Sequence, residues 1–310
     1  MKRIQYRKYG GPELMQIEDF SLQAPAKGEV TVRVKFAAIN PIDWKLRSGK
    51  MKLITGRAFP RTMGMDFSGI VMAIGPEVAR FKVGDAVFGL ARFKESGALG
   101  QAVITKEIFL AKKPHTISFE EAACLGTPGV TAWNGLIDKA GLQPGQEVFI
   151  NGCAGAVGEA AVQIAKLFGA NISGSCRASD MARAAALGVQ RVYDYRTTDL
   201  SAIPTRFNVV YDTAATMTVR MGISMLCPGG MFLDLTPGLG KFIKALFDRR
   251  LKPIIGSPRA EILEKVAEAA GAGKFSIPIG QMVQLDGAIQ LITELELGRK
   301  LGGKGVVAME

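Results

Sequence analysis

Three evenly spaced glycines form the motif in this sequence whose chemistry is easiest to interpret. Gly152, Gly155 and Gly158 follow the predicted strand 147–151 and precede a helical pattern at 159–168. Glycine allows a tight turn and a close approach of the backbone to a ligand, and the free N–H groups at a helix N-terminus attract phosphate. A strand, a glycine turn and a helix in this order are the context in which the motif binds the pyrophosphate of a dinucleotide. The sequence therefore predicts a dinucleotide site here, with an ordinary glycine-rich turn as the alternative.

The residues after the next predicted strand indicate which dinucleotide is bound. Sites for NAD place Asp or Glu there, where it binds the ribose 2′-hydroxyl. This sequence has Ser175 and Arg177 instead. Arg177 can pair with a 2′-phosphate and Ser175 can donate a hydrogen bond to it, so NADPH is favoured, by roughly ten- to a hundred-fold for one charge-assisted hydrogen bond. The nearest acid, Asp180, is expected to cap a helix.

The composition excludes several other chemistries. The chain has 310 residues, a single histidine, and four cysteines without a Cys-x-x-Cys pair. This inventory argues against Ser-His-Asp triads, histidine metal sites, structural zinc and a disulfide framework. The net charge of +11 favours anionic partners, but the basic residues are spread along the chain, so nucleic acid is not expected. The densest basic stretch, 240–252, can form an amphipathic helix, which leaves contact with a membrane surface as a less favoured alternative.

The order of the predicted elements indicates two kinds of domain. Short runs rich in β-branched residues, bounded by turn residues, occur at 31–39, 67–75 and 85–90 and predict a compact β-rich domain. Strands and helices then alternate, as in βαβ units with a parallel sheet. The predicted strands there are 147–151, 171–176, 191–195, 207–212 and 230–235, and the predicted helices are 119–125, 131–140, 159–168 and 180–187. The chain ends with a helix at 260–270, a strand at 275–279, a helix at 285–297 and a strand at 305–309.

Several longer segments together resemble one protein family. They are YGGPE at 9–13, GEVTVRV at 28–34, AINPIDWKLRSG at 38–49, GMDFSGIVMAIG at 64–75, FKVGDAVFG at 81–89, GTPGVTAW at 126–133 and AVGEAAVQIAKLFGA at 156–170. With them the chain resembles the zinc-free quinone oxidoreductase and enone reductase branch of the medium-chain dehydrogenase/reductase superfamily. The resemblance implies an α/β fold in which a GroES-like β-rich catalytic domain is split around a Rossmann domain with a doubly wound parallel sheet. We therefore expect the catalytic domain at 1–118 and 259–310 and the Rossmann domain at 119–258.

The same resemblance implies further contacts with the cofactor. It places Thr131 and Thr236 near the nicotinamide, Tyr195 at the adenosine phosphate, and Lys304 in a segment that closes over the cofactor. The expected NADPH-binding residues are therefore Thr131, Gly155, Ala156, Val157, Ser175, Arg177, Tyr195, Thr236 and Lys304. Ala154 and Ala156 stand where this branch more often has Ser and Gly, a departure that should tighten the turn without abolishing phosphate binding.

The segments that bind zinc in related alcohol dehydrogenases lack zinc ligands here. They read Ile39-Asn40-Pro41 and Gly64-Met65-Asp66, without the Cys and His that a catalytic zinc needs. The resemblance then implies hydride transfer from NADPH to a quinone or to the β-carbon of an α,β-unsaturated carbonyl, which leaves an enolate. Asn40, Asp43 and Lys45 are the candidate catalytic residues: Lys45 to stabilise the enolate or relay a proton, and Asp43 to orient Lys45 or a water. The alternatives are a helix cap for Asp43, a surface cation for Lys45, and water as the proton source.

Two other functions stay open at this stage. One is an enoyl-thioester reductase of the same superfamily, and the other is an NADPH-binding protein with a regulatory or nucleic-acid-binding role. The start of the sequence lacks the apolar stretch of a secretory signal, and no apolar run is long enough for a membrane span, so a cytoplasmic protein is expected. A homodimer is left open, because members of this branch are often dimers. Cys124 is expected to be a buried structural thiol.

Overall fold

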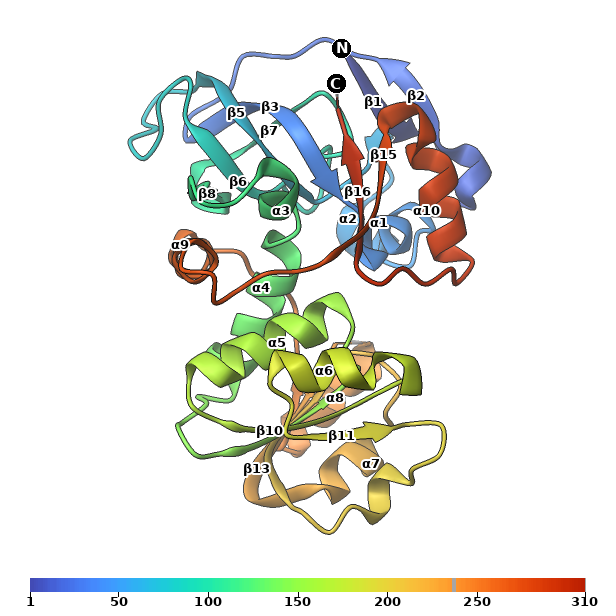
Figure 1. The fold of residues 1–310 in the computed structure, drawn as a ribbon. Coiled ribbons are helices and arrows are strands. Elements are labelled where there is room, and N and C mark those ends of the chain that lie inside the picture. The colour runs from blue at the N-terminus through green and yellow to red at the C-terminus, as the bar shows by residue number, and fades with distance from the viewer. Residues whose placement is uncertain (236–237, 310) are drawn as a thin grey trace. The chain divides into compact units, whose positions relative to one another are not determined.

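The structure, a computed structural model, describes residues 1–235 and 238–309 and divides into two units (Figure 1). The first unit contains Met1–Thr127 and the segment from Pro258 onward, and the second contains Pro128–Ser257. The first boundary follows Thr127 rather than residue 118, because helix α3 (Phe119–Ala123) belongs to the first unit. Ser68 of the first unit donates a hydrogen bond to the Phe119 carbonyl at 2.5 Å. No helix within the described ranges is long and apolar enough to cross a membrane.

Strand β3 is the centre of the first unit. It pairs antiparallel with β5, β7 and β16 in a seven-stranded sheet of order β15-β16-β3-β5-β6-β8, with β7 off this path. A three-stranded sheet has the order β2-β1-β4. The strands are β1 (Lys2–Tyr6), β2 (Gln16–Asp19), β3 (Glu29–Ala38), β4 (Arg61–Thr62), β5 (Asp66–Ile74), β6 (Ala86–Leu90), β7 (Ala102–Lys106), β8 (Leu110–Lys112), β15 (Ile279–Gln284) and β16 (Lys304–Ala308). The C-terminal strand therefore completes the sheet that the N-terminal segment begins.

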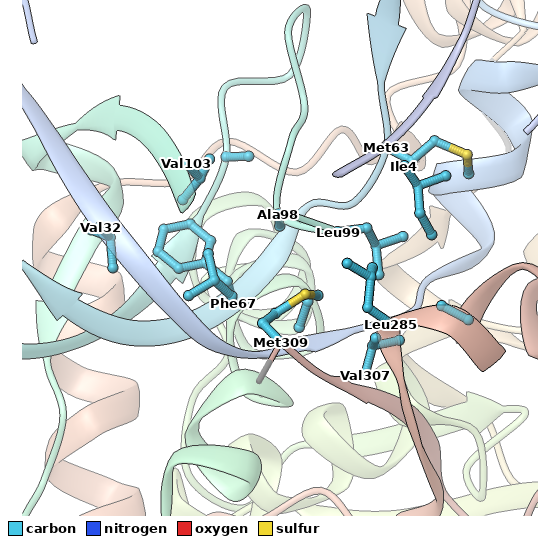
Figure 2. Close-up of a cluster of buried hydrophobic side chains, with 14 of the residues drawn as sticks. Ile4, Val32, Met63, Phe67, Ala98, Leu99, Val103, Leu285, Val307 and Met309 are labelled. Carbon is cyan, nitrogen blue, oxygen red and sulfur yellow. The ribbon is translucent and has the colours of Figure 1, made fainter. Parts of the chain in front are cut away.

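The apolar core of the first unit joins these two sheets. Ile4 of β1, Phe67 of β5 and Val307 of β16 belong to one cluster of fully buried side chains, and Figure 2 shows them gathered with Met63 and Leu99. Alternate residues of a strand face the same side, which is why each strand contributes only some of its side chains. The helices of this unit are α1 (Pro41–Arg47), α2 (Lys52–Thr55), α3, α9 (Ala260–Gly271) and α10 (Ala288–Glu296).

The second unit is built on a six-stranded sheet in which every pair is parallel. Its order is β11-β10-β9-β12-β13-β14, with β9 (Glu147–Asn151), β10 (Asn171–Cys176), β11 (Arg191–Asp194), β12 (Phe207–Asp212), β13 (Leu226–Asp234) and β14 (Leu251–Pro253). The chain runs outward from β9 to β11 and then returns to build from β12 to β14. Such a reversal beside β9 marks the place where doubly wound sheets bind ligands, at the carboxyl ends of the strands.

Helices cover both faces of this sheet. Helix α5 (Ala156–Leu167) packs on β9 and β10 and against α6 (Met181–Leu187), as Figure 1 shows. Phe149 of β9 points to the opposite face, where it clusters with Phe207, Phe232 and side chains of α7 (Val219–Ser224) and α8 (Leu239–Phe247). Helix α4 (Gly126–Trp133) crosses the boundary between the units and continues as a π-helix at Asn134–Lys139. The expected β-rich domain and the expected doubly wound parallel-sheet domain are both confirmed.

The predicted elements at 275–279 and 240–252 differ from the structure. The strand expected at 275–279 begins only at Ile279, because Pro278 has no N–H to donate to a sheet ladder. The basic stretch 240–252 is helical only as far as Phe247, and Leu251–Pro253 joins the sheet as β14, parallel to β13. Composition alone suggested one helix, but the last two residues of the stretch belong to the edge strand of the sheet.

Candidate functional site

The glycine turn joins β9 to α5 at the carboxyl end of β9. Gly152 has a φ of +81°, a left-handed conformation that favours glycine. A Cβ on Gly158 would lie 2.0 Å from the Gly152 carbonyl oxygen, so the helix packs directly on the turn. Gly155 is the exposed N-cap of α5, and a Cβ there would meet only that oxygen, at 3.4 Å. The first helical N–H groups, those of Ala156 and Val157, have no partners within the helix, so the turn is an open cradle that fits a pyrophosphate.

Buried hydrogen bonds hold the strand ends together beneath this turn. Asn151 Nδ2 donates to Asp212 Oδ1 at 2.7 Å, which links β9 to β12. Ser175 Oγ donates to Asn151 Oδ1 at 2.6 Å, which links β10 to β9. Ser175 is completely buried, so its hydroxyl is used inside the sheet. The predicted hydrogen bond from Ser175 to a 2′-phosphate gains no support from this position, because the side chain points into the network and not to solvent.

Arg177 lies just beyond the end of β10 and is partly exposed. Its guanidinium donates to Asp180 Oδ2 through Nε at 3.0 Å and through Nη2 at 2.9 Å. Asp180 stands at the N-cap of α6 but makes no side-chain capping hydrogen bond. The expected helix cap is therefore wrong: the carboxylate pairs with Arg177 instead.

A second arginine, Arg183, ties this region to the glycine turn. It forms an ion pair with Glu159, which is buried in the first turn of α5, and its Nη2 donates to the Ala154 carbonyl at 3.0 Å. The same Nη2 lies 3.5 Å from Asp180 Oδ1. Sequence reasoning missed Arg183, because nothing in the sequence shows that α6 turns this residue back toward the glycines.

Tyr195 follows β11 at the same edge of the sheet. Its N–H donates to the carbonyl of Cys176, at the end of β10, at 3.3 Å, and its side chain is 48% exposed. The Arg196 guanidinium lies 5.9 Å from the centre of its ring. Tyr195 and Arg177 therefore both flank the end of β10, and the exposed ring is available to a nucleotide.

The resemblance places Thr131 and Thr236 near the nicotinamide, and the structure describes only the first of them. Thr131 is partly buried in α4, and its carbonyl accepts a hydrogen bond from the Tyr211 hydroxyl at 2.8 Å, which fixes α4 to β12. Thr236 lies outside the described residues.

In the first unit, a buried polar cluster gathers residues from distant segments. Lys304 Nζ donates to Asn40 Oδ1 at 2.5 Å and lies 3.4 Å from Asp66 Oδ2. Asn40 Nδ2 donates to Asp66 Oδ2 at 3.0 Å and to the Ala38 carbonyl at 3.1 Å. Both N–H groups of the Asn40 amide are therefore occupied within the protein. Lys304, predicted to bind the cofactor, directs its ammonium group into this cluster.

Asp66 also belongs to this cluster, although the sequence analysis did not include it among the predicted site residues. Its other oxygen, Oδ1, accepts hydrogen bonds from the Thr127 N–H at 2.8 Å and from the Thr127 hydroxyl at 2.6 Å. The carboxylate is fully buried and is neutralised by Lys304. The sequence does contain a sign of this role, because Asp66 begins the mostly apolar strand DFSGIVMAI. A carboxylate that is buried with such a strand requires a partner.

Asp43 caps helix α1. Its Oδ2 accepts the Asn40 N–H at 2.8 Å in a capping box, which is the structural alternative stated for this residue. Burial raises the pKa of Asp43 to about 7, and the nearby Asp66 charge adds to the effect, while the Asn40 N–H and the Lys304 charge oppose it. The structure shows no pairing of Asp43 with Lys45.

Lys45 is a cation on helix α1. Its side chain is partly exposed on α1 and has no hydrogen-bond or ion-pair partner within residues 1–235 and 238–309. Cys124 is fully buried, its Sγ lies 3.4 Å from the Glu120 carbonyl, and burial raises its pKa to about 12. The expected burial of the Cys124 thiol is confirmed.

The donors in the polar cluster do not fit a zinc ion. Among the described residues no group of three His, Cys, Asp or Glu side chains gathers as a metal site. The two segments that correspond to zinc-binding segments do converge, through Asn40 and Asp66, but they converge on the Lys304 ammonium. An amide and a single carboxylate around a fixed positive charge are unsuited to holding a second cation.

Comparison with known proteins assigns the family. Residues 26–129 match the alcohol dehydrogenase GroES-like domain, and residues 156–235 match the zinc-binding dehydrogenase family. The chain is 31% identical over 292 residues to 2-methylene-furan-3-one reductase of Solanum lycopersicum, covering 87% of this chain and 75% of that protein. This chain belongs to the medium-chain dehydrogenase/reductase superfamily, in its quinone oxidoreductase branch. It is also 29% identical over 295 residues to the chloroplast envelope quinone oxidoreductase homolog of Arabidopsis thaliana, covering 90% of each chain.

Solved structures agree with this assignment. The quinone oxidoreductase of Coxiella burnetii superimposes with a TM-score of 0.90 at 28% identity, covering 100% of this chain and 99% of that one. The Escherichia coli quinone oxidoreductase complexed with NADPH gives 0.84 at 26%, covering 99% and 100%. An NAD-dependent alcohol dehydrogenase also gives 0.84, at 28%, covering 100% of both. This medium-chain reductase is therefore an oxidoreductase that uses a nicotinamide cofactor.

Proposed function

We propose that this medium-chain reductase transfers a hydride from NADPH to quinones or α,β-unsaturated carbonyls without zinc. The observation that carries the proposal is the position of Lys304. Its ammonium group lies between Asn40 and Asp66, the residues of the two segments that correspond to zinc-binding segments. Without a metal to polarise an ordinary carbonyl, the acceptor must already be electrophilic. The names of the similar proteins, quinone oxidoreductase and 2-methylene-furan-3-one reductase, describe acceptors of this kind.

The side chains of the first unit divide into contacting and positioning residues. A bound nicotinamide would supply the hydride. Lys45 is partly exposed and unpaired within the described chain, so it is a cation available to stabilise the oxygen of an enolate or to pass it a proton. Asn40 has no free N–H, and Asp43 caps α1, so these two are positioning residues that fix the start of the helix carrying Lys45.

The preference for NADPH rests on Arg177 in the second unit. It lies beyond the end of β10, where a ribose 2′-substituent is bound in this fold, and its guanidinium is partly exposed. A guanidinium matches the geometry of a phosphate, which NADH lacks. Ser175 is not part of this proposal, because its buried hydroxyl donates to Asn151 Oδ1.

A panel assay tests this function. Initial rates would be measured with small enones, quinones, simple aldehydes and enoyl-CoA substrates, each with NADPH and NADH, with and without a chelator. We expect turnover of enones or quinones that prefers NADPH and resists the chelator. Activity confined to enoyl-CoA would instead identify an enoyl-thioester reductase, and activity lost with the chelator would refute the zinc-free reaction.

The role of Lys45 is tested by substitution. Lys45→Met should lower kcat by about 10²–10³-fold, the usual loss when one donor to a developing oxyanion is removed. Lys50→Met is the matched control, because Lys50 is an exposed cation just beyond the same helix. An unchanged kcat in Lys45→Met would leave water as the proton source and remove Lys45 from the reaction.

A further inference from the structure

We propose that Asp180 limits the preference of this protein for NADPH, because it holds the guanidinium group that a 2′-phosphate needs. The proposal concerns the cofactor choice of the reductase and so rests on the proposed function. It makes Asp180 a specificity-determining residue, although the sequence suggested only a helix cap.

The first argument is that Asp180 is the established partner of Arg177. The Nε and Nη2 atoms of Arg177 lie on one edge of its guanidinium, and both donate to Asp180 Oδ2, at 3.0 and 2.9 Å. A phosphate also prefers two parallel N–H donors from one edge. Asp180 therefore occupies an edge that a 2′-phosphate would use, and the phosphate must displace the carboxylate or bind the remaining N–H groups.

The second argument is that Arg183 cannot replace Arg177. Arg183 neutralises the buried Glu159 and binds the Ala154 carbonyl of the glycine turn. Moving Arg183 toward a ligand would leave the Glu159 carboxylate without its cation in a buried position, which is costly. Of the two arginines, Arg177 is the one free to move, because Asp180 is its only ion-pair partner within the described chain.

The third argument is electrostatic. Arg177 and Arg183 bring two positive charges, and Asp180 and Glu159 bring two negative charges, so the group as a whole is neutral. A 2′-phosphate placed on Arg177 would also lie beside the Asp180 carboxylate, whose second oxygen is 3.5 Å from Arg183. Like charges at hydrogen-bond distances repel, whereas a carboxylate at this edge of the sheet can accept the 2′-hydroxyl of NADH. Asp180 therefore weakens binding of one cofactor without opposing the other.

Binding of the two oxidised cofactors separates these effects. NADP⁺ and NAD⁺ differ only in the 2′-phosphate, and their dissociation constants would be measured by isothermal titration calorimetry. Relative to the unmodified protein, Asp180→Asn should bind NADP⁺ roughly ten-fold more tightly, as expected for one freed charge-assisted contact, and NAD⁺ no more tightly. Asp180→Ser gives a second test without an amide that could take over the contact to Arg177.

A matched control and a double variant make the assignment specific. Asp248→Asn removes the same charge from a similar pair, because Arg250 Nε and Nη2 both donate to Asp248 at 2.9 Å in the segment that leads into β14, at the opposite edge of the sheet. It should leave the ratio of NADP⁺ to NAD⁺ affinity unchanged. Arg177→Met should lower NADP⁺ affinity, and the gain from Asp180→Asn should disappear in the double variant.

The outcomes distinguish this inference from the proposed function. Tighter NADP⁺ binding in Asp180→Asn or Asp180→Ser that depends on Arg177 supports the inference. An affinity ratio that is the same in both Asp180 variants and in the unmodified protein overturns it, whatever that ratio is. The proposed preference for NADPH is tested separately by the unmodified protein: if NAD⁺ binds as tightly as NADP⁺, the preference fails, while the effect of Asp180 is still read from the variants.

Discussion

Each unit of this protein contains a basic side chain paired with an aspartate, and the two pairs differ in almost every physical respect. The side chains of Lys304 and Asp66 are 4% and 1% exposed, and two further residues, Asn40 and Thr127, satisfy their polar atoms. The side chains of Arg177 and Asp180 are 33% and 18% exposed and are three residues apart. The first pair is a fixed part of the fold, whereas the second can exchange partners with a ligand.

Desolvation explains this difference. A charge taken out of water is stable only while its partner stays in place, so breaking a buried pair is costly. A partly exposed pair gains little, because water screens its attraction and replaces a lost partner. Burial of a pair therefore indicates a structural or positioning role, and partial exposure at a binding edge indicates a role in recognition.

The largest effect should come from removing the buried cation. Lys304→Met leaves the Asp66 carboxylate buried without its cation and should lower the free energy of unfolding by up to about 5 kcal/mol. Urea unfolding of the purified protein measures this. The double variant with Asp66→Asn should recover part of the loss, because no charge is then left unpaired. A single variant as stable as the original protein would mean that water reaches Asp66.

The next effect concerns Asp43, a buried acid that lies near the charges of Asp66 and Lys304. Burial raises its pKa from 3.8 to about 7, so between these values the folded protein holds the Asp43 proton more tightly than the unfolded chain does. Stability should therefore fall as the pH rises from 4 to 7, by at most about 4 kcal/mol, and Asp43 should add no further change above pH 7. Asp43→Asn should flatten this part of the curve. Equal slopes in both proteins would show that Asp43 is ionised throughout.

Arg183 and Glu159 form a pair of intermediate burial, with side chains 34% and 5% exposed. Arg183→Met should cost about 1–3 kcal/mol, the penalty for leaving a buried polar group without its partner. It should also loosen the glycine turn, because the bond to the Ala154 carbonyl is lost. Thermal unfolding and hydrogen exchange of the turn amides measure the two consequences. A cost as large as that of Lys304→Met would contradict the dependence on burial.

The smallest effect on stability should come from Asp180→Asn. Its pair with Arg177 is partly exposed and local, so the free energy of unfolding should change by less than about 0.5 kcal/mol. The same unfolding assay checks this, with Asp248→Asn alongside. A change in cofactor selectivity without a change in stability would complete the contrast with Lys304, whereas a loss above 2 kcal/mol would make Asp180 a structural residue as well.

Local patterns in the sequence predicted much of the second unit. The strands β9, β10 and β12 begin and end at the predicted residues, because each is a short segment that lies between turn signals or helical patterns in the sequence. The glycine turn was also predicted in its place, since strand, turn and helix are continuous in sequence. The pairing of Arg177 with Asp180 could also have been predicted, because a basic and an acidic residue lie three positions apart. The sequence analysis instead gave more weight to the preference of Asp for helix N-caps.

The polar cluster of the first unit was beyond prediction from local patterns. Asn40, Asp66, Thr127 and Lys304 come from four separate segments, and only the pairing of β16 with β3 and of β3 with β5 brings them together. Sequence reasoning placed Asn40 and Lys304 in different roles for this reason. It gave Asp43 a catalytic role, while the stated alternative, a helix cap, is what the structure shows.

The pairing of β16 with β3 also has a consequence for biosynthesis. The second unit is one continuous stretch, Pro128–Ser257, so it can fold on the ribosome while the first unit is still incomplete. The Asp66 carboxylate, by contrast, meets its ammonium partner only after 238 further residues have been translated. Until then the nascent chain carries an unneutralised acid and an open sheet edge along β3, and a ribosome that stalls before Lys304 releases a product that cannot close its N-terminal sheet.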